Sequence, residues 1–197
     1  MARTVLTWFF LMMAPTLIGL PVCAQTNLEE RTLKAMAEHM AARYDIPFPL
    51  FSAIITRESG WRHDVRGSQG EVGLAQVHPK TFQRLQRQGL VKGDPTHPAT
   101  NLEAGAIYLR QVMSSFTELE LANAQAHLHL APLEVFAASY NWGPDNLKRA
   151  ILGFRMVPPS VRAYARRIKA LLDESKGSSD VSSSLPGHHH RDREVMR

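Results

Sequence analysis

A single carboxylate stands on the apolar face of a predicted helix. Residues 49–59 are predicted to be helical, and Glu58 follows Ile54 by four positions and Ile55 by three, so it shares their face. A charge on a face that points into the core is costly unless it is paired or neutralised. No Lys or Arg stands on that stripe to pair with Glu58. The adjacent Arg57 points about a quarter-turn away from it. The spacing therefore predicts a carboxyl group in an unusual environment.

Two effects are expected to raise the pKa of Glu58. Burial among apolar side chains disfavours the charged form, and the negative end of the helix dipole acts in the same direction in the last turn. A carboxylic acid that keeps its proton near neutral pH can act as a general acid. Alternatively, the helix frays at residue 57 and leaves Glu58 solvated. From the spacing alone, a proton donor and a solvated surface acid both stay open.

Most of the signals for helix starts and ends indicate a mainly α fold. Prolines stand at helix starts, glycines at helix ends, and apolar residues recur at three- and four-residue spacing. The predicted helices cover 28–44, 49–59, Pro79 to Gly89, a segment after a Thr100–Glu103 capping box, Pro132 to 142–144, 145–152, and a last one from Pro159 or Ser160. Residues 61–78, with Gly67, Gly70 and Gly73, are predicted to form a tight loop or small β-hairpin. The region 117–131 fits either a helix or an insertion loop.

The two ends of the chain differ from its middle. Residues 1–24 combine an early arginine with an apolar run and end in Val-Cys-Ala, which predicts a signal peptide cleaved after residue 24. A transmembrane anchor is the alternative, but prolines and a glycine interrupt the run, which is short for a bilayer span. Residues 175–197 are Ser/Gly-rich, include three histidines at 188–190, and are predicted to be flexible. One folded domain, 25–174, is predicted between them.

The composition narrows the class of protein. With 197 residues, 44% hydrophobic and 21% charged, the chain suits one domain and excludes a collagen-like or wholly disordered protein. One cysteine excludes a disulfide framework or a multi-cysteine zinc site. The net charge of +5 suits an anionic partner, whether wall polymer, nucleic acid or membrane surface. The predicted helices hold several arginines that could form a basic face: Arg84, Arg87, Arg149, Arg162, Arg166 and Arg167. No nucleic-acid motif accompanies them, and the export signal argues against that partner.

Four short segments in a fixed order carry a family resemblance. They are Glu-Ser-Gly-Trp at 58–61, Gly-Glu-Val-Gly-Leu-Ala-Gln-Val-His-Pro at 70–79, Asn-Leu-Glu-Ala-Gly-Ala-Ile-Tyr-Leu at 101–109 and Ala-Ala-Ser-Tyr-Asn-Trp-Gly-Pro at 137–144. Each segment is weak by itself, but the ordered set resembles the soluble lytic transglycosylase (SLT) domain family over about residues 46–172. The resemblance implies a mainly α, lysozyme-like helical domain with the Gly-rich loop or hairpin beside the catalytic helix.

The chain departs from the family pattern at several positions. Ala75 stands where a methionine often precedes the glutamine, Gly67 where the loop often has a serine, and His63 where a proline is usual. Ser-Val at 160–161 replaces a Glu-Thr pair before the last tyrosine. These differences bear on subsite contacts and chain-length preference, and they leave the proposed acid in place.

The resemblance implies a site built around one acid. It gives Glu58 as the catalytic residue and implies substrate binding by Ser59, Gln76, Tyr140, Asn141 and Tyr164. From the residues alone, Gln76 could instead bond loop backbone, and Tyr140 could be a half-buried core ring. The glycine at 105 is expected to serve close helix packing.

The implied activity is cleavage of the β-1,4 bond between N-acetylmuramic acid and N-acetylglucosamine in peptidoglycan, which leaves a 1,6-anhydromuramic end. Glu58 would serve first as acid and then as base, and the resemblance implies neither a metal nor an organic cofactor. The implied partners are glycan strands and, by analogy with stand-alone family members, a secretion or conjugation complex. Nucleic acid and stable membrane insertion after signal cleavage are not expected. The implied location is periplasmic or exported.

Two alternatives remain open. A lysozyme-type peptidoglycan hydrolase would need a second carboxylate to activate water, and Asp64 and Glu71 in the predicted loop are the candidates. Both could equally be solvated loop charges. The other alternative is a non-catalytic wall-binding assembly factor on the same fold.

Overall fold

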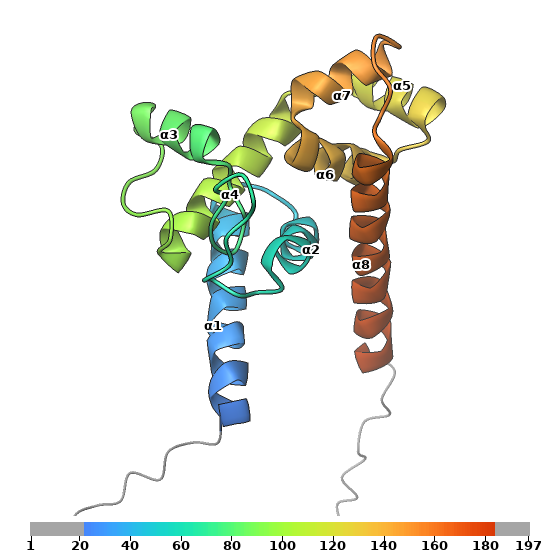
Figure 1. Cartoon of the computed structure of the whole chain (residues 1–197). Helices are drawn as coiled ribbons and strands as arrows, with labels where there is room; N and C mark the ends of the chain where they lie inside the picture. The colour runs from blue at the N-terminus through green and yellow to red at the C-terminus, as the bar shows by residue number, and fades with distance from the viewer. Residues whose placement is uncertain (1–21, 184–197) are drawn as a thin grey trace, which may run out of the picture.

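Helix α2 (Phe48–Ser59), which carries Glu58 in its last turn, lies among other helices. It packs against α1 (Val22–Arg43), α6 (Pro132–Trp142) and α8 (Pro159–Ser183), as Figure 1 shows. Proline at the start of α2 and Gly60 in the left-handed region at its end (φ 59°) fix the limits of this helix. The predicted helix at 49–59 is therefore present.

The structure, a computed structural model, describes residues 22–183, and the side chains of 28–176. Its other helices are α3 (Pro79–Arg87), α4 (Pro98–Ser114), α5 (Glu118–Leu128) and α7 (Pro144–Ile151). Most of the predicted signal peptide and the histidines at 188–190 lie outside the described residues. Helix α8 continues to Ser183, past the start of the predicted flexible tail at 175. Within the described part, no helix is both long and apolar enough to span a bilayer.

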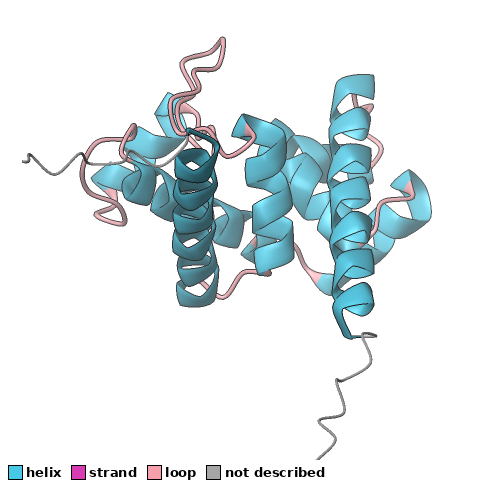
Figure 2. Cartoon of the chain, turned by 90° about the horizontal axis from the view of Figure 1, so that it is seen from below, coloured by secondary structure: helices cyan, strands magenta, loops and turns pink. Residues whose placement is uncertain are grey.

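Residues 22–183 contain no β-strand, so the predicted mainly α fold is confirmed (Figure 2). The segment between α2 and α3 is a loop with two isolated antiparallel bridges, Arg66 to Val72 and Val72 to Val77. These bridges do not extend into a ladder, and the hairpin alternative is not confirmed. The loop, residues 60–78, is called the glycine loop below.

One predicted helix start is wrong, and the region that was left open between helix and loop contains a helix. The predicted capping box of Thr100 and Glu103 is wrong, because α4 begins at Pro98 after an extended His97. Proline fixes the backbone for the first helical turn, and Glu103 instead accepts a hydrogen bond from Tyr44 Oη at 2.6 Å. The ambiguous region 117–131 contains α5, which starts with a capping box of Thr117 and Glu120.

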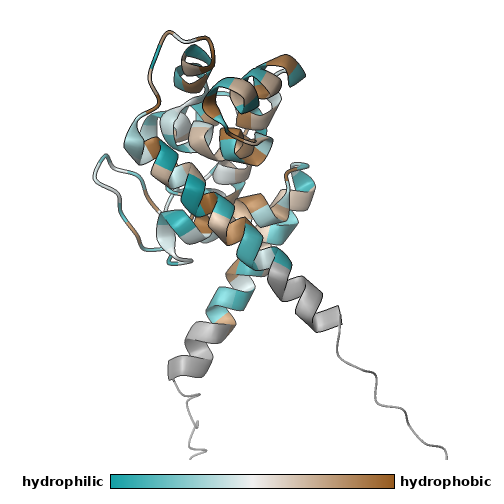
Figure 3. Cartoon of the chain, turned by 90° about the vertical axis from the view of Figure 1, so that its right-hand side faces the viewer, coloured by the Kyte–Doolittle hydropathy of each residue, from teal (hydrophilic) through white to brown (hydrophobic). Residues whose placement is uncertain are grey.

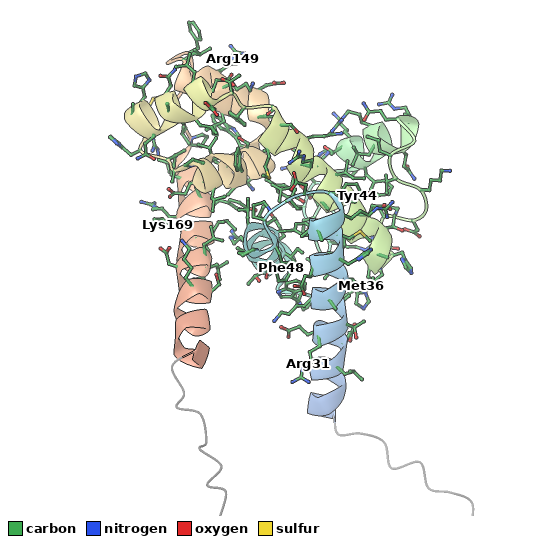
Figure 4. The ribbon with its side chains drawn as sticks, turned by 180° about the vertical axis from the view of Figure 1, so that it is seen from behind. Arg31, Met36, Tyr44, Phe48, Arg149 and Lys169 are labelled. Atoms are coloured by element: carbon green, nitrogen blue, oxygen red, sulfur yellow. The ribbon has the colours of Figure 1, made fainter. Side chains whose placement is uncertain are left out.

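Two hydrophobic clusters hold the helices. The larger includes the fully buried Leu50, Phe51, Ile54 and Ile55 of α2, and the smaller lies between the glycine loop, α3 and α4. Tyr44, directly after the end of α1, packs against both clusters. Figure 4 labels Tyr44 at the end of α1 and Phe48 at the start of α2. The alternation of hydrophilic and hydrophobic residues along the helices is visible in Figure 3. Burial of one helix face therefore fixes the rotation of α2 about its axis.

Asn101 on α4 ties the glycine loop to the helices. Its side chain is fully buried, its Oδ1 accepts from the Ala75 N–H at 2.8 Å, and its Nδ2 donates to the carbonyls of Val72 (2.8 Å) and Pro95 (2.9 Å). Gly73 (φ 76°) lies so close that an added Cβ would come within 2.6 Å of the Asn101 amide. A loop without a sheet thus obtains its shape from buried side chain to backbone bonds.

Replacing Asn101 with Ala should destabilise the protein by about 2–4 kcal/mol, because one buried N–H and two carbonyls lose their partner. Urea unfolding measures the loss. Asn123→Ala on α5 is the matched control, because no hydrogen bond of its side chain is found in the described residues. Equal stability of the two variants would contradict this role of Asn101.

Candidate active site

A cleft of about 440 Å³ opens above the end of α2. Helices α2, α3, α4 and α6 and the glycine loop contribute side chains to it. The lining residues are Glu58, Gly67, Ser68, Gln69, Glu71, Gln76, Val77, His78, Thr81, Tyr108, Tyr140, Asn141, Trp142 and Gly143. Four of the six residues that the family resemblance implied for the site therefore line one cleft: Glu58, Gln76, Tyr140 and Asn141.

Glu58 is half-buried in the cleft, as its position on the apolar face predicted. Its Oε1 accepts a hydrogen bond from Tyr164 Oη at 2.7 Å. Burial raises the pKa of Glu58 above its ordinary value; the Tyr164 hydrogen bond and the charge of Arg57 oppose this, and the charge of Glu71 adds to it. The predicted direction of the shift is confirmed, and the carboxyl group is suited to donating a proton.

Tyr164 of α8 lies behind Glu58. The ring is buried, does not line the cleft, and has the Arg57 guanidinium 5.6 Å from its centroid. Burial, followed by the charge of Glu58, raises the pKa of the Tyr164 hydroxyl well above its usual value. The hydroxyl therefore remains a donor and orients the carboxyl of Glu58 from behind.

Tyr140 of α6 joins the cleft to the glycine loop. Its hydroxyl is buried and donates to the carbonyl of Ala75 at 2.8 Å, and its ring packs on Tyr108 with centroids 5.0 Å apart. Burial raises its pKa well above the usual value. Close packing at Gly105 permits this contact, since an added Cβ there would lie 2.5 Å from the Ala75 Cβ and 3.3 Å from the Tyr140 hydroxyl. The expected packing role of Gly105 is confirmed.

Gln76 combines a place in the cleft with a role in the loop. Its Nε2 donates to the carbonyls of Gly73 (2.7 Å) and Val65 (3.1 Å). The amide nitrogen therefore bonds loop backbone, which was the alternative to substrate binding in the sequence analysis. Its backbone φ of 45° is in the left-handed region, which the turn of the loop requires. An added Cβ at Gly67 would lie 2.9 Å from Gln76 Oε1, so the loop closes tightly over this side chain.

Two candidates from the sequence face away from the cleft. Ser59 is buried, donates from its hydroxyl to the carbonyl of Ile55 at 3.2 Å, and does not line the cleft. Asp64 is exposed and borders other depressions of the surface, whereas Glu71 lines the cleft. Glu71 Oε2 accepts from the Gln69 N–H at 2.9 Å. Of the two possible second carboxylates, the structure brings only Glu71 to Glu58.

Several lining residues had not been singled out as site residues. They are Ser68, Gln69, His78, Thr81, Tyr108 and Trp142. Tyr108 and Trp142 stand inside the resemblance segments 101–109 and 137–144, which offered a signal for them. His78 likewise stands inside the segment 70–79. Ser68, Gln69 and Thr81 lie outside the four segments and gave no signal, because polar side chains there look like ordinary solvated positions. In the described part of the chain, no group of three or more His, Cys, Asp or Glu side chains could hold a metal ion.

The chain matches the family model of the Transglycosylase SLT domain over residues 35–156, which is more than half of its length. The chain belongs to that family.

Three solved structures with a similar fold are lytic transglycosylases. An inactive mutant of Slt from Pseudomonas aeruginosa is 20% identical, with a TM-score of 0.58 over 80% of this chain and 26% of that one. The 70-kDa soluble lytic transglycosylase from Escherichia coli is 22% identical, with a TM-score of 0.56 over 82% of this chain and 26% of that one. A complex of the 70-kDa soluble lytic transglycosylase with bulgecin A is 20% identical, with a TM-score of 0.57 and the same coverage of both chains. The chain thus spans about a quarter of the length of these proteins.

Replacing Tyr164 with Phe should raise the pKa of Glu58 further, because its hydroxyl stabilises the charged carboxylate. Carbon-13 NMR titration of the glutamate carboxyls measures the change. Tyr44→Phe is the matched control, since Tyr44 bonds Glu103 instead, and it should leave the titration of Glu58 unchanged. An unchanged or lower pKa of Glu58 in Tyr164→Phe would show that the hydroxyl does not act on the carboxylate.

Replacing Glu58 with Gln should stabilise the protein at pH 7.5. The folded state holds the Glu58 proton more tightly than the unfolded state does, so the contribution of Glu58 to stability is greatest at low pH and is lost as pH rises through its raised pKa. The gain in the free energy of unfolding of Glu58→Gln over the wild type should therefore shrink when urea unfolding is repeated at a pH below the ordinary pKa of glutamate. Glu118→Gln, an exposed position on α5, should show no such pattern. A gain that is independent of pH would contradict the linkage.

Proposed function

We propose that the protein is a peptidoglycan lytic transglycosylase with Glu58 as its acid and base. Membership of the SLT domain family supports this activity, and one observation carries it: the Glu58 carboxyl, with its raised pKa, lies in a cleft and is oriented by a buried tyrosine. The mutant of Pseudomonas aeruginosa Slt with a matching fold is described as inactive after a glutamate was replaced by glutamine. That description supports a glutamate-dependent mechanism for the present chain.

In the proposed reaction, protonated Glu58 donates its proton to the glycosidic oxygen as the bond to C1 of N-acetylmuramic acid breaks. The 2-acetamido group of the sugar stabilises the positive charge that develops at C1. The Glu58 carboxylate then removes the proton of the C6 hydroxyl, whose oxygen closes on C1 and gives the 1,6-anhydro end. The acid is regenerated, no water is consumed, and no protein nucleophile is needed.

The cleft residues have supporting roles in this proposal. Tyr108 and Tyr140 form an aromatic wall that can contact the apolar faces of sugar rings, while Asn141 is exposed at the rim and can bond sugar hydroxyls or amides. Gln76 keeps the glycine loop in shape, and its Oε1 is the amide atom that can meet the substrate. Tyr164 acts on the position of Glu58, to which its hydroxyl donates a hydrogen bond. Ser59 bonds the carbonyl of Ile55 in its own helix and does not line the cleft.

A hydrolase is the second candidate function, because Glu71 also lines the cleft and its charge acts on Glu58. In a hydrolase, the Glu71 carboxylate would activate a water that attacks C1. Its Oε2 already accepts the Gln69 N–H, which orients the group within the loop. The two reactions give different products from the same bond.

Mass spectrometry of fragments released from purified peptidoglycan tests the proposal. The wild-type protein should release muropeptides one water lighter than hydrolysed fragments, and Glu58→Gln should lower the release by at least about 1,000-fold because the amide has no proton to donate. Glu118→Gln should leave release unchanged.

If the products instead carry hydrated, reducing ends, and Glu71→Gln no longer forms them, the protein is a hydrolase and the proposed transglycosylase activity is wrong. A folded Glu58→Gln protein that still cleaves would overturn the role of Glu58. Binding to the wall without cleavage by the wild type would instead favour the assembly factor.

Peptidoglycan as the substrate also requires that the chain act outside the cytoplasm. The predicted signal peptide at 1–24 supports a periplasmic or exported location. By analogy with stand-alone members of the family, we propose that the protein opens the wall locally for a secretion or conjugation complex. Cell fractionation with sequencing of the mature N-terminus tests the location.

A further inference from the structure

The chain leaving α7 returns to the rim of the cleft. Gly153 has φ 79°, and the N–H of Phe154 donates to the carbonyl of Arg149 at 2.8 Å, which closes the helix with a left-handed turn. The next residue, Arg155, consequently lies beside Trp142, which lines one end of the cleft.

The Arg155 side chain is ordered by two contacts although it is exposed. Its guanidinium lies 5.0 Å from the centroid of the Trp142 ring, and its Nη1 donates to Asn146 Oδ1 at 2.5 Å. Asn146 in turn donates from Nδ2 to the carbonyl of Trp142 at 2.6 Å. Asn146 thus links the arginine to the residue that carries the ring, and the guanidinium loses little further entropy on binding a ligand.

The charge of Arg155 is not neutralised by an ion pair. Among residues 28–176, no Asp or Glu forms a salt bridge with it. One of its five N–H groups is used by Asn146, which leaves the others for a ligand. A planar guanidinium with free N–H groups matches the two oxygens of a carboxylate.

We propose that Arg155, held on Trp142, binds a carboxylate of the stem peptide attached to N-acetylmuramic acid. This inference rests on the proposed function, since it names a substrate feature recognised at the same cleft. The glycan backbone is uncharged, whereas the stem peptides carry carboxylates, so a cation at the rim distinguishes peptide-bearing strands from bare ones. Arg155 is therefore a specificity residue that contributes nothing to the bond-breaking step itself.

The test compares two substrates prepared from one peptidoglycan sample: intact material, and the same glycan after an amidase has removed the stem peptides. Arg155→Ala should lower the initial rate of anhydromuramic end formation on the intact material about tenfold at subsaturating substrate and leave the rate on the stripped glycan unchanged. Arg155→Lys should show an intermediate loss, because a lysine keeps the charge and loses the planar fork.

Arg149→Ala is the matched control. Arg149 is exposed on α7, the helix that precedes Arg155, lies at the end of the molecule formed by α5 and α7 (Figure 4), and does not line the cleft. Its replacement removes the same charge and should not change the rate of anhydromuramic end formation on either substrate. Asn146→Ala should reproduce part of the Arg155→Ala loss, again on the intact material only, because the guanidinium loses its tether.

Equal losses on both substrates, or no loss on either, would overturn the role of Arg155 while leaving the proposed function standing. A loss of similar size in Arg149→Ala would also overturn it, because only the net charge would then matter. If the wild-type protein forms anhydromuramic ends from neither substrate, the proposed function fails, and this inference fails with it.

Discussion

The burial of the Glu58 carboxyl is the constraint on which the rest of the site depends. The apolar face of α2 is fully buried at Leu50, Phe51, Ile54 and Ile55, so the helix cannot rotate without exposing its core contacts. That fixed rotation brings Glu58, one turn further along the same face, to the floor of the cleft. Desolvation there raises the pKa of the carboxyl, and the property needed for proton donation follows from helix packing.

The opposite wall of the cleft has a different physical basis. The glycine loop contains no sheet, and its shape is set by buried polar bonds from Asn101 on α4, Tyr140 on α6 and its own Gln76. Such bonds are directional and costly to leave unmade, so they hold backbone atoms more specifically than apolar contacts do. Because two of these anchors come from helices that also line the cleft, the loop and helices keep their spacing together.

Helical periodicity was enough to predict the mainly α fold, the helix that carries Glu58 and the direction of its pKa shift. It could not predict the start of α4. The sequence offered a capping pattern at Thr100, but the helix begins at Pro98, and Glu103 accepts a hydrogen bond from Tyr44 instead of closing a capping box. Nor could it tell that Ser59 faces its own helix or that Glu71 lines the cleft while Asp64 does not. These outcomes depend on tertiary contacts and loop geometry, which residue spacing along one segment does not reveal.

The side chains around Glu58 orient its carboxyl group without lowering its pKa below the ordinary value. A Lys or Arg in direct contact would orient it strongly and also lower its pKa. The group that bonds Glu58 is instead the neutral hydroxyl of Tyr164, whose own pKa is raised well above the usual range. The nearby cation, Arg57, lies against the Tyr164 ring and forms no ion pair with Glu58 in the described part of the chain. Since its charge still favours the carboxylate, burial and these two neighbours oppose each other, and the net result is a raised pKa of Glu58, which is the property that the proposed acid and base needs.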